Sequence, residues 1–138
     1  MRVLVADDSR VARMVIRGII ENIGHEVVEA ANGREVLEKV EELNGDVNLV
    51  ILDWHMPELE GVDTLKSLKN DKRFKHIPVM MMTSESEQDN VDQAMALGAT
   101  CYVSKPYNKE DLSFKIEECL YTNKIDSDSN SDNSEVEQ

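Results

Sequence analysis

The chain has 138 residues and is strongly acidic, with 28 Asp or Glu against 15 Lys or Arg and a formal net charge of −13. This length suits one domain, and 41% hydrophobic residues can form an ordinary core. The acidity argues against a protein that binds nucleic acid or anionic membranes, because such proteins usually display a basic surface. The apolar stretch at the N-terminus, residues 3–6, is too short for a signal peptide or a membrane span, so we expect a cytoplasmic protein.

Residues 1–121 alternate short apolar runs with amphipathic stretches, a pattern that indicates strands and helices in turn. The fourth run is apolar throughout and the third is apolar apart from Asn48, as strands covered on both faces should be, whereas Glu26 and Glu29 in and beside the second run favour an edge strand. The five predicted strands are Val3–Ala6, Val27–Ala30, Val47–Leu52, Ile77–Met82 and Thr100–Val103.

Each run is followed by a stretch with apolar residues at helical spacing, which predicts five helices packed on the sheet. Ser9 and Asn32 are predicted N-caps of the first two. Right-handed connections between the strands would give an α/β fold with an open parallel five-stranded sheet and helices on both faces. The apolar stripes expected to face the sheet are Val11, Val15, Ile19 and Ile23; Val36, Leu37, Val40 and Leu43; Val62, Leu65 and Leu68; Val91, Met95 and Gly98; and Leu112, Ile116, Cys119 and Leu120.

Residues 122–138 differ from the rest, since they hold five acidic residues, one Lys and only two aliphatic residues. Such a segment buries too little apolar surface to order itself, so we predict a domain over 1–121 followed by an acidic disordered tail. The two cysteines, Cys101 and Cys119, have no metal-ligand spacing and no secretion signal precedes them. We expect them to be buried thiols rather than a disulfide.

Acidic and polar side chains follow four of the five predicted strands, where an open α/β sheet places its ligand site. Carboxylates gathered there would repel one another by roughly 4 kcal/mol per pair at about 4 Å and an effective dielectric near 20. A cation must therefore compensate, and Mg²⁺ prefers a site of one or two carboxylates, waters and a phosphate. The residues concerned are Asp7 and Asp8, Asp53, Thr83 and Ser84, and Ser104, Lys105 and Pro106.

Acids, one hydroxyl and one Lys are also the groups that handle a phosphoryl group. Asp53 would be the nucleophile, because carboxylates form covalent aspartyl-phosphates. The three histidines are scattered along the chain, and neither a G-x-x-x-x-G-K-[ST] nor a G-x-G-x-x-G loop is present.

These residues resemble those of the receiver domains of two-component response regulators, over residues 1 to about 121. The motifs that carry the resemblance are Asp7-Asp8-Ser9, Asp53-Trp54-His55-Met56-Pro57-Glu58-Leu59-Glu60-Gly61, Thr83-Ser84 and Lys105-Pro106. The resemblance implies a flavodoxin-like doubly wound (βα)5 fold with strand order 2-1-3-4-5.

The resemblance also implies a role for each residue. Asp53 would accept a phosphoryl group from a phosphohistidine of a sensor histidine kinase, and Thr83 and Lys105 would contact that group, with a cis Lys105-Pro106 peptide. One Mg²⁺ would be held by Asp8, Asp53 and the backbone carbonyl of His55, with Asp7 acting mainly through water. Tyr102 would be the switch aromatic, whose ring turns when Thr83 moves toward the phosphoryl group.

Other residues are expected to tune or read this switch. His55 and Glu85 lie two residues beyond Asp53 and Thr83, where side chains can steer the water that hydrolyses the acyl phosphate. Tyr102 and Pro106 are assigned to the face that a partner reads. Phe114 is added to that face, because it lies opposite Leu112 and Ile116 around the last helix and should be exposed.

The resulting hypothesis is a monomeric stand-alone regulator of chemotaxis type that catalyses only its own phosphorylation and dephosphorylation. Residues 122–138 are too few for an output domain, so we expect the output to be carried by an effector protein such as a flagellar motor switch. A phosphatase is a further partner considered. One alternative is a phosphorelay intermediate that passes phosphoryl to a His phosphotransfer protein. Another is a receiver-like module that never takes phosphoryl, against which the full acidic set and Lys105 argue.

A phosphatase of the haloacid dehalogenase type is the alternative from another class, since it also uses Asp, Mg²⁺ and Lys. Its nucleophile normally follows the first strand and has a second Asp two residues on. Here Asp53 follows the third predicted strand and His55 stands two residues on, which disfavours that enzyme.

Overall fold

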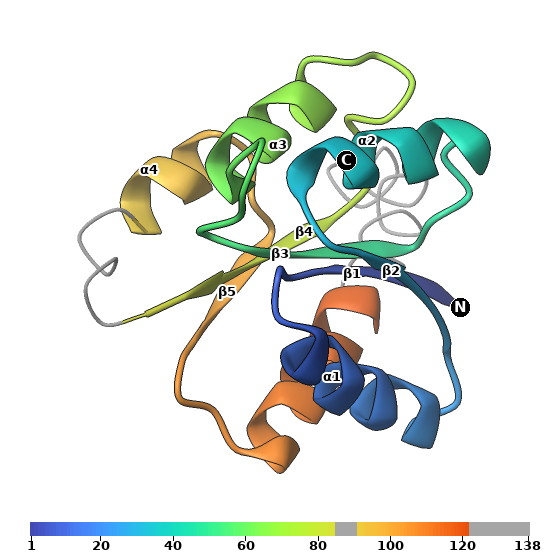
Figure 1. Cartoon of the computed structure of the whole chain (residues 1–138), viewed down its shortest axis with the longest axis vertical. Coiled ribbons are helices and arrows are strands. Elements are labelled where there is room, and N and C mark those ends of the chain that lie inside the picture. Colours follow the sequence, from blue (N-terminus) through green and yellow to red (C-terminus); the bar gives the residue numbers. More distant parts are fainter. Residues whose placement is uncertain (85–90, 122–138) are drawn as a thin grey trace, which may run out of the picture.

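Five parallel strands form one sheet in the order β2-β1-β3-β4-β5 (Figure 1). The computed structural model describes residues 1–84 and 91–121. The observed order and parallel pairing confirm the flavodoxin-like fold, and β2 is an edge strand as Glu26 and Glu29 indicated. The strands are β1 (Arg2–Ala6), β2 (Glu26–Ala30), β3 (Leu49–Asp53), β4 (Val79–Thr83) and β5 (Cys101–Ser104).

Helices cover both faces of the sheet (Figure 1). On one face lie α2 (Gly33–Glu42), α3 (Gly61–Lys69) and α4 (Val91–Ala96), and on the other lie α1 (Arg10–Asn22) and a C-terminal helix that the structure describes over 109–121. Alternate strand residues enter the two cores, because successive side chains of a strand point to opposite faces. Met81 accordingly packs beneath α3, whereas Met80 and Met82 belong to the core under α1 and the C-terminal helix.

The first two helices begin where the sequence predicted. The Ser9 hydroxyl accepts a hydrogen bond from the Ala12 amide over 3.1 Å, and the Asn32 side chain accepts one from the Glu35 amide over 2.9 Å. These contacts satisfy amides that a helix N-terminus leaves unpaired. The Ser9 cap therefore fixes where α1 begins, two residues after Asp8.

The apolar stripe predicted for the first helix is wrong at its N-terminal end. Val11 and Val15 are 66% and 50% exposed, while the buried residues of α1 are Ile16, Ile19 and Ile20. A spacing of four residues turns about 40° further than a full helical turn at each step, so four such residues cannot all face the sheet. The same drift leaves Met95 40% exposed in α4, where Ala94 is buried instead.

The stripe of the C-terminal helix is confirmed, with Leu112, Ile116, Cys119 and Leu120 all buried, and Phe114 is exposed as predicted. The prediction of free thiols is wrong: the structure joins Cys101 and Cys119 in a disulfide. The packing of this helix on β5 brings their Cα atoms to 7.1 Å, a proximity that a separation of 18 residues does not reveal. The proposed tail over 122–138 lies outside the described residues.

None of the helices in the described part of the chain is long and apolar enough to cross a lipid bilayer.

Candidate functional site

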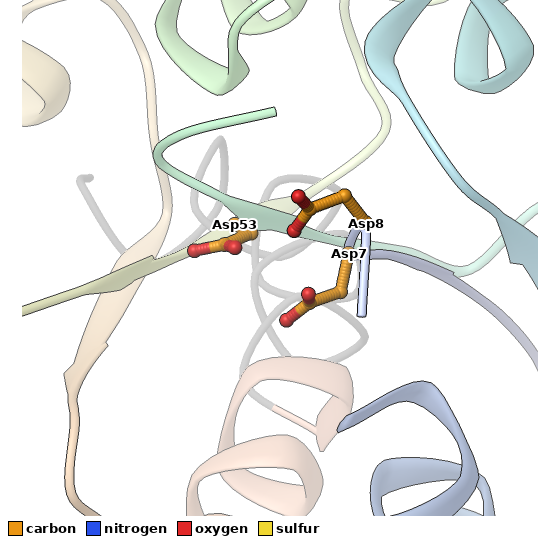
Figure 2. Close-up of side chains that lie close together, drawn as sticks. All are labelled: Asp7, Asp8 and Asp53. Atoms are coloured by element: carbon orange, nitrogen blue, oxygen red, sulfur yellow. The ribbon is translucent and has the colours of Figure 1, made fainter. Parts of the chain in front are cut away.

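Three carboxylates from two strands meet at the carboxyl edge of the sheet. Asp7 and Asp8 follow β1 and Asp53 ends β3, and one oxygen from each lies within 4.8 Å of the others. Figure 2 shows the three side chains gathered at this edge. The pairing of Ala6 with Leu52 produces this meeting, because it brings the ends of the two strands level.

Asp7 is held so that one of its oxygens faces the site. Its amide donates to the Ala30 carbonyl over 3.2 Å, and its Oδ1 accepts from the Ser9 amide over 2.9 Å. Its Oδ2 is buried and has no hydrogen-bond partner. A buried carboxylate oxygen without a donor is costly unless a cation or water completes it, so this residue set fits a hard divalent ion such as Mg²⁺.

Lys105, in the loop after β5, brings a positive charge to the three carboxylates. Its Nζ donates to Asp53 Oδ1 over 3.2 Å and lies 3.6 Å from Asp7 Oδ2. The peptide between Lys105 and Pro106 is cis, as the resemblance implied. The Lys105 amide also donates to the Thr83 carbonyl, which fixes the loop after β5 to the end of β4.

The protonation of these groups reflects burial and mutual charge. Burial and the charge of Asp7 raise the pKa of Asp53, and Lys105 opposes this rise. For Lys105 burial acts to lower the pKa, but the charges of Asp53 and Asp7 overcome it and raise that pKa. Burial also raises the pKa of the Tyr107 phenol, while Lys105 acts to lower it. The site therefore pairs Asp53, a carboxylate with a raised pKa, with Lys105, an ammonium whose raised pKa favours its charged form.

The remaining residues predicted for phosphoryl contact and switching lie on β4 and β5. Thr83 is buried at the end of β4, in register with Ser104. Tyr102 is 36% exposed and, with Pro106 and Phe114, lines a cavity of about 390 Å³ between β5 and the C-terminal helix. The structure thus brings together the three residues predicted for a partner face.

His55 turns its ring toward the loop that follows β3. Its Nδ1 lies 2.9 Å from Glu60 Oε1, and the side chain is exposed. The predicted metal role of its backbone carbonyl stays a prediction. Glu85, its predicted partner in tuning, lies outside the described residues.

The loop from Asp53 to α3 is closed against the strand end at Gly61. The Gly61 amide donates to the Trp54 carbonyl over 2.9 Å, and a Cβ placed on Gly61 would collide with the Asp53 carbonyl. The glycine at the end of the predicted motif is thus required by close backbone approach.

Two residues near the site were missed by sequence reasoning. The Arg13 guanidinium donates to the Asp7 carbonyl over 2.7 Å and to Glu29 Oε1 over 2.9 Å. Glu29 was considered only as a mark of an edge strand, and Arg13 was not singled out. A signal was present, because an inward-facing charge on a strand usually needs a partner of opposite charge.

Comparison with known proteins decides the family. The family model described as response regulator receiver domain matches residues 3–117. The chain belongs to this family. Receiver domains generally bind Mg²⁺ at an acidic pocket, and Asp7, Asp8 and Asp53 form such a cluster here. Membership also implies interaction with a histidine kinase and with downstream effectors.

Curated relatives of this receiver domain include chemotaxis proteins. Chemotaxis protein CheY1 of Helicobacter pylori is 40% identical over 124 residues, covering 89% of this chain and 99% of its own length. The chemotaxis protein CheY homolog of Campylobacter jejuni is 34% identical and covers 88% of this chain and 94% of its own length. The chain is therefore CheY-like along nearly the whole of these relatives.

Solved structures agree with this assignment. A response regulator receiver domain protein from Clostridium thermocellum superposes with a TM-score of 0.82 at 33% identity, covering 90% of this chain and 97% of that one. Vibrio cholerae chemotaxis protein CheY4 gives a TM-score of 0.78 at 30% identity, covering 86% and 97%.

Proposed function

We propose that this receiver domain is a phosphorylation switch in which Asp53 accepts a phosphoryl group from a phosphohistidine of a sensor histidine kinase. The observation that carries the proposal is the position of the Asp53 carboxylate, which is largely buried, hydrogen-bonded to Lys105 and flanked by Asp7 and Asp8. In the proposed role the protein catalyses only its own phosphorylation and dephosphorylation. It acts as a monomer and without nucleic acid or membrane.

The chain supplies a nucleophile and a charge partner. One Asp53 oxygen attacks phosphorus as the bond from phosphorus to the histidine nitrogen breaks. The raised pKa of Asp53 makes its carboxylate more basic and so a better nucleophile, while Lys105 favours its ionised form. After transfer, Lys105 neutralises a phosphoryl oxygen and the Thr83 hydroxyl donates to another.

Asp8 and Asp53, with Asp7 mainly through water and with the His55 backbone carbonyl, are proposed to hold one Mg²⁺. When bound, this ion neutralises charge that builds up on the phosphoryl oxygens. Asp7 Oδ2 supports the assignment, because this buried oxygen accepts no hydrogen bond from the described residues and its nearest cation, Lys105 Nζ, lies 3.6 Å away. His55 and Glu85 are proposed to tune the attack of water on the phosphorylated form.

A surface on α1 supports contact with a protein phosphodonor. Val11, Met14 and Val15 are all exposed on α1, which begins at Arg10, two residues after Asp8. A docked donor would bury this apolar surface while its phosphohistidine reaches Asp53. Exposed apolar groups that cluster beside a reactive site are typical of protein interfaces.

A second surface is proposed to carry the output. Tyr102, Pro106 and Phe114 border one cavity, and Phe114 is 67% exposed although it is large and apolar. When Thr83 moves toward a phosphoryl group on Asp53, the Tyr102 ring turns inward and the cavity changes shape. A partner that anchors on this cavity then distinguishes the two forms.

The specific pathway proposed is control of chemotaxis, with a flagellar motor switch protein as effector. The support is the similarity to chemotaxis proteins of Helicobacter pylori and Campylobacter jejuni over nearly their whole length.

The test is phosphorylation of the purified protein by acetyl phosphate, followed by intact mass and by fluorescence of Trp54, the only tryptophan. Trp54 is buried and adjoins Asp53, so its emission should change with Mg²⁺ and again with phosphodonor. We expect a Mg²⁺-dependent gain of one phosphoryl group that Asp53→Asn abolishes. A gain that survives Asp53→Asn, or no gain at all, would contradict the proposal.

A further inference from the structure

Arg13, in the first turns of α1, connects the acidic site to the edge of the sheet. Its Nη1 donates to the Asp7 carbonyl over 2.7 Å and its Nε donates to Glu29 Oε1 over 2.9 Å. The side chain is only 15% exposed. A guanidinium is suited to this geometry, because its rigid fork presents several donors in one plane.

The contact with the Asp7 carbonyl completes the anchoring of that residue. The Asp7 amide and Oδ1 are bonded to Ala30 and Ser9, so Arg13 holds the one remaining backbone group. The Asp7 carbonyl belongs to the same rigid peptide plane as the Asp8 amide. Arg13 therefore fixes the direction in which both aspartates leave the end of β1.

Arg13 is itself held in place by a chain of ion pairs. Glu29 Oε2 accepts from Arg17 Nε over 2.6 Å, and Arg17 also pairs with Glu21 over 2.9 Å. Hydrogen bonds from Arg17 and Arg13 lower the pKa of Glu29, which keeps it ionised as a partner. Two arginines thus face two carboxylates, and the network adds little net charge to the site.

We propose that Arg13 is a positioning residue for the Mg²⁺ site, acting through the Asp7 carbonyl and held by Glu29. The proposal rests on the proposed function, because it concerns the same acidic cluster. Its role is to keep Asp7 and Asp8 turned toward Asp53 against their mutual repulsion. Groups that orient metal ligands typically change metal affinity about 10- to 100-fold when removed.

The sign of the effect separates positioning from simple electrostatics. Removing a positive charge near three carboxylates would by charge alone strengthen the binding of a cation. Loss of the Asp7 anchor would weaken it instead. Weaker Mg²⁺ binding in an Arg13 variant is therefore a result that charge alone does not produce.

The experiment is a Mg²⁺ titration of the full chain, followed by Trp54 fluorescence, for four proteins. They are the wild type, Arg13→Gln, Arg13→Lys and Arg10→Gln. Arg10 is the matched control, because it is an exposed arginine at the start of the same helix. We expect the Kd for Mg²⁺ to rise about tenfold in Arg13→Gln, to rise less in Arg13→Lys, and to stay constant or fall in Arg10→Gln.

Two further readouts distinguish positioning from a loss of stability. At saturating Mg²⁺ the rate of phosphorylation by acetyl phosphate should return toward the wild-type value, so that only the half-saturating Mg²⁺ concentration shifts. Adding Glu29→Gln to Arg13→Gln should weaken binding no further, whereas Glu29→Gln alone should weaken it, since the two side chains act as one unit.

An unchanged or lower Kd in Arg13→Gln would overturn the positioning role and leave the proposed function intact. Absence of Mg²⁺ binding by the wild type would overturn both. If Arg13→Gln lowered only the melting temperature and kept the Kd of the folded protein, Arg13 would be structural and the inference wrong.

Discussion

Lys105 donates a hydrogen bond from Nζ to Oδ1 of Asp53 across 3.2 Å, joining the loop after β5 to the end of β3. The two residues are 52 positions apart in the chain, and each alters the protonation of the other. Lys105 thereby opposes the rise in the pKa of Asp53 that burial and Asp7 cause.

Replacing Lys105 with Met should raise the pKa of Asp53 further, because the charge that opposes burial is lost. The pKa of the Tyr107 phenol should rise as well, since Lys105 acts to lower it. Carbon-13 NMR titration of the carboxyl groups without Mg²⁺ measures the first change, and ultraviolet titration of the phenol measures the second. Lys105→Arg keeps the charge and should shift both values much less; equal shifts in the two variants would contradict this account.

Asp53→Asn should stabilise the protein near neutral pH when Mg²⁺ is absent. The raised pKa of Asp53 means that the folded protein holds this proton more tightly than the unfolded chain does. Stability therefore falls as pH rises from the unfolded value of 3.8 through the raised folded value, and the ionised carboxylate opposes folding above that range. We expect a melting temperature a few degrees higher than that of the wild type at pH 7, and a difference that disappears toward pH 4.

The control for this prediction is Asp46→Asn, because Asp46 is an exposed carboxylate paired with Arg2 over 3.0 Å. That variant should be neutral or slightly less stable at pH 7. Mg²⁺ should raise the melting temperature of the wild type, since it binds the folded state, and should do so less for Asp53→Asn. A lower melting temperature for Asp53→Asn at pH 7 without Mg²⁺ would show that the carboxylate does not oppose folding.

Gly61→Ala should destabilise the protein by about 1–3 kcal/mol, because its new Cβ meets the Asp53 carbonyl and rotation about a side-chain bond cannot relieve the collision. The shifted strand end should also slow phosphorylation by acetyl phosphate. Gly18→Ala is the matched control, since Gly18 lies within α1 and a Cβ there meets nothing within 4 Å. That substitution should stabilise by about 0.5–1 kcal/mol, as alanine favours the helix. Chemical denaturation compares the two, and similar effects would refute the steric argument.

The strand order was predictable only through the resemblance to receiver domains, whereas the meeting of Asp7, Asp8, Asp53 and Lys105 followed from parallel strands, which bring their carboxyl ends to one edge. The buried face of α1 was not predictable, since Val11 and Ile16 are both aliphatic and only the packed sheet selects between them. The disulfide between Cys101 and Cys119 also depends on how a helix packs on a strand.

The Arg13 network shows another limit of sequence reasoning. Arg13 and Glu29 are 16 residues apart, and their pairing depends on the place of β2 beside β1 in the sheet. Patterns of single elements indicate which type of element a segment forms. They do not predict which charged side chains bridge two elements until the strand order is known.

Phe114 and the α1 surface should separate effector binding from phosphorylation by a protein donor. Phe114→Ala should weaken capture of an effector by the phosphorylated form about tenfold or more, as expected for an aromatic anchor that a bound partner covers, and leave the rate of phosphorylation unchanged. Replacing Val11 and Met14 with Ala should slow transfer from a phosphorylated histidine kinase and leave effector binding unchanged. Val11 and Phe114 are almost equally exposed, at 66% and 67%, so each variant is a matched control for the other.

Phosphorylation by acetyl phosphate distinguishes a defect in the α1 surface or the Phe114 surface from a defect in the acidic site. A small phosphodonor needs no docking surface, so both variants should be phosphorylated by it at the wild-type rate. Val11, Met14 and Phe114 are all exposed, and each variant should change the free energy of unfolding by no more than about 0.5 kcal/mol. If Phe114→Ala retained full affinity for the effector, the cavity beside Tyr102 would not be the surface that the partner reads. If the α1 variant also lost its response to acetyl phosphate, the defect would lie in the acidic cluster rather than in donor docking.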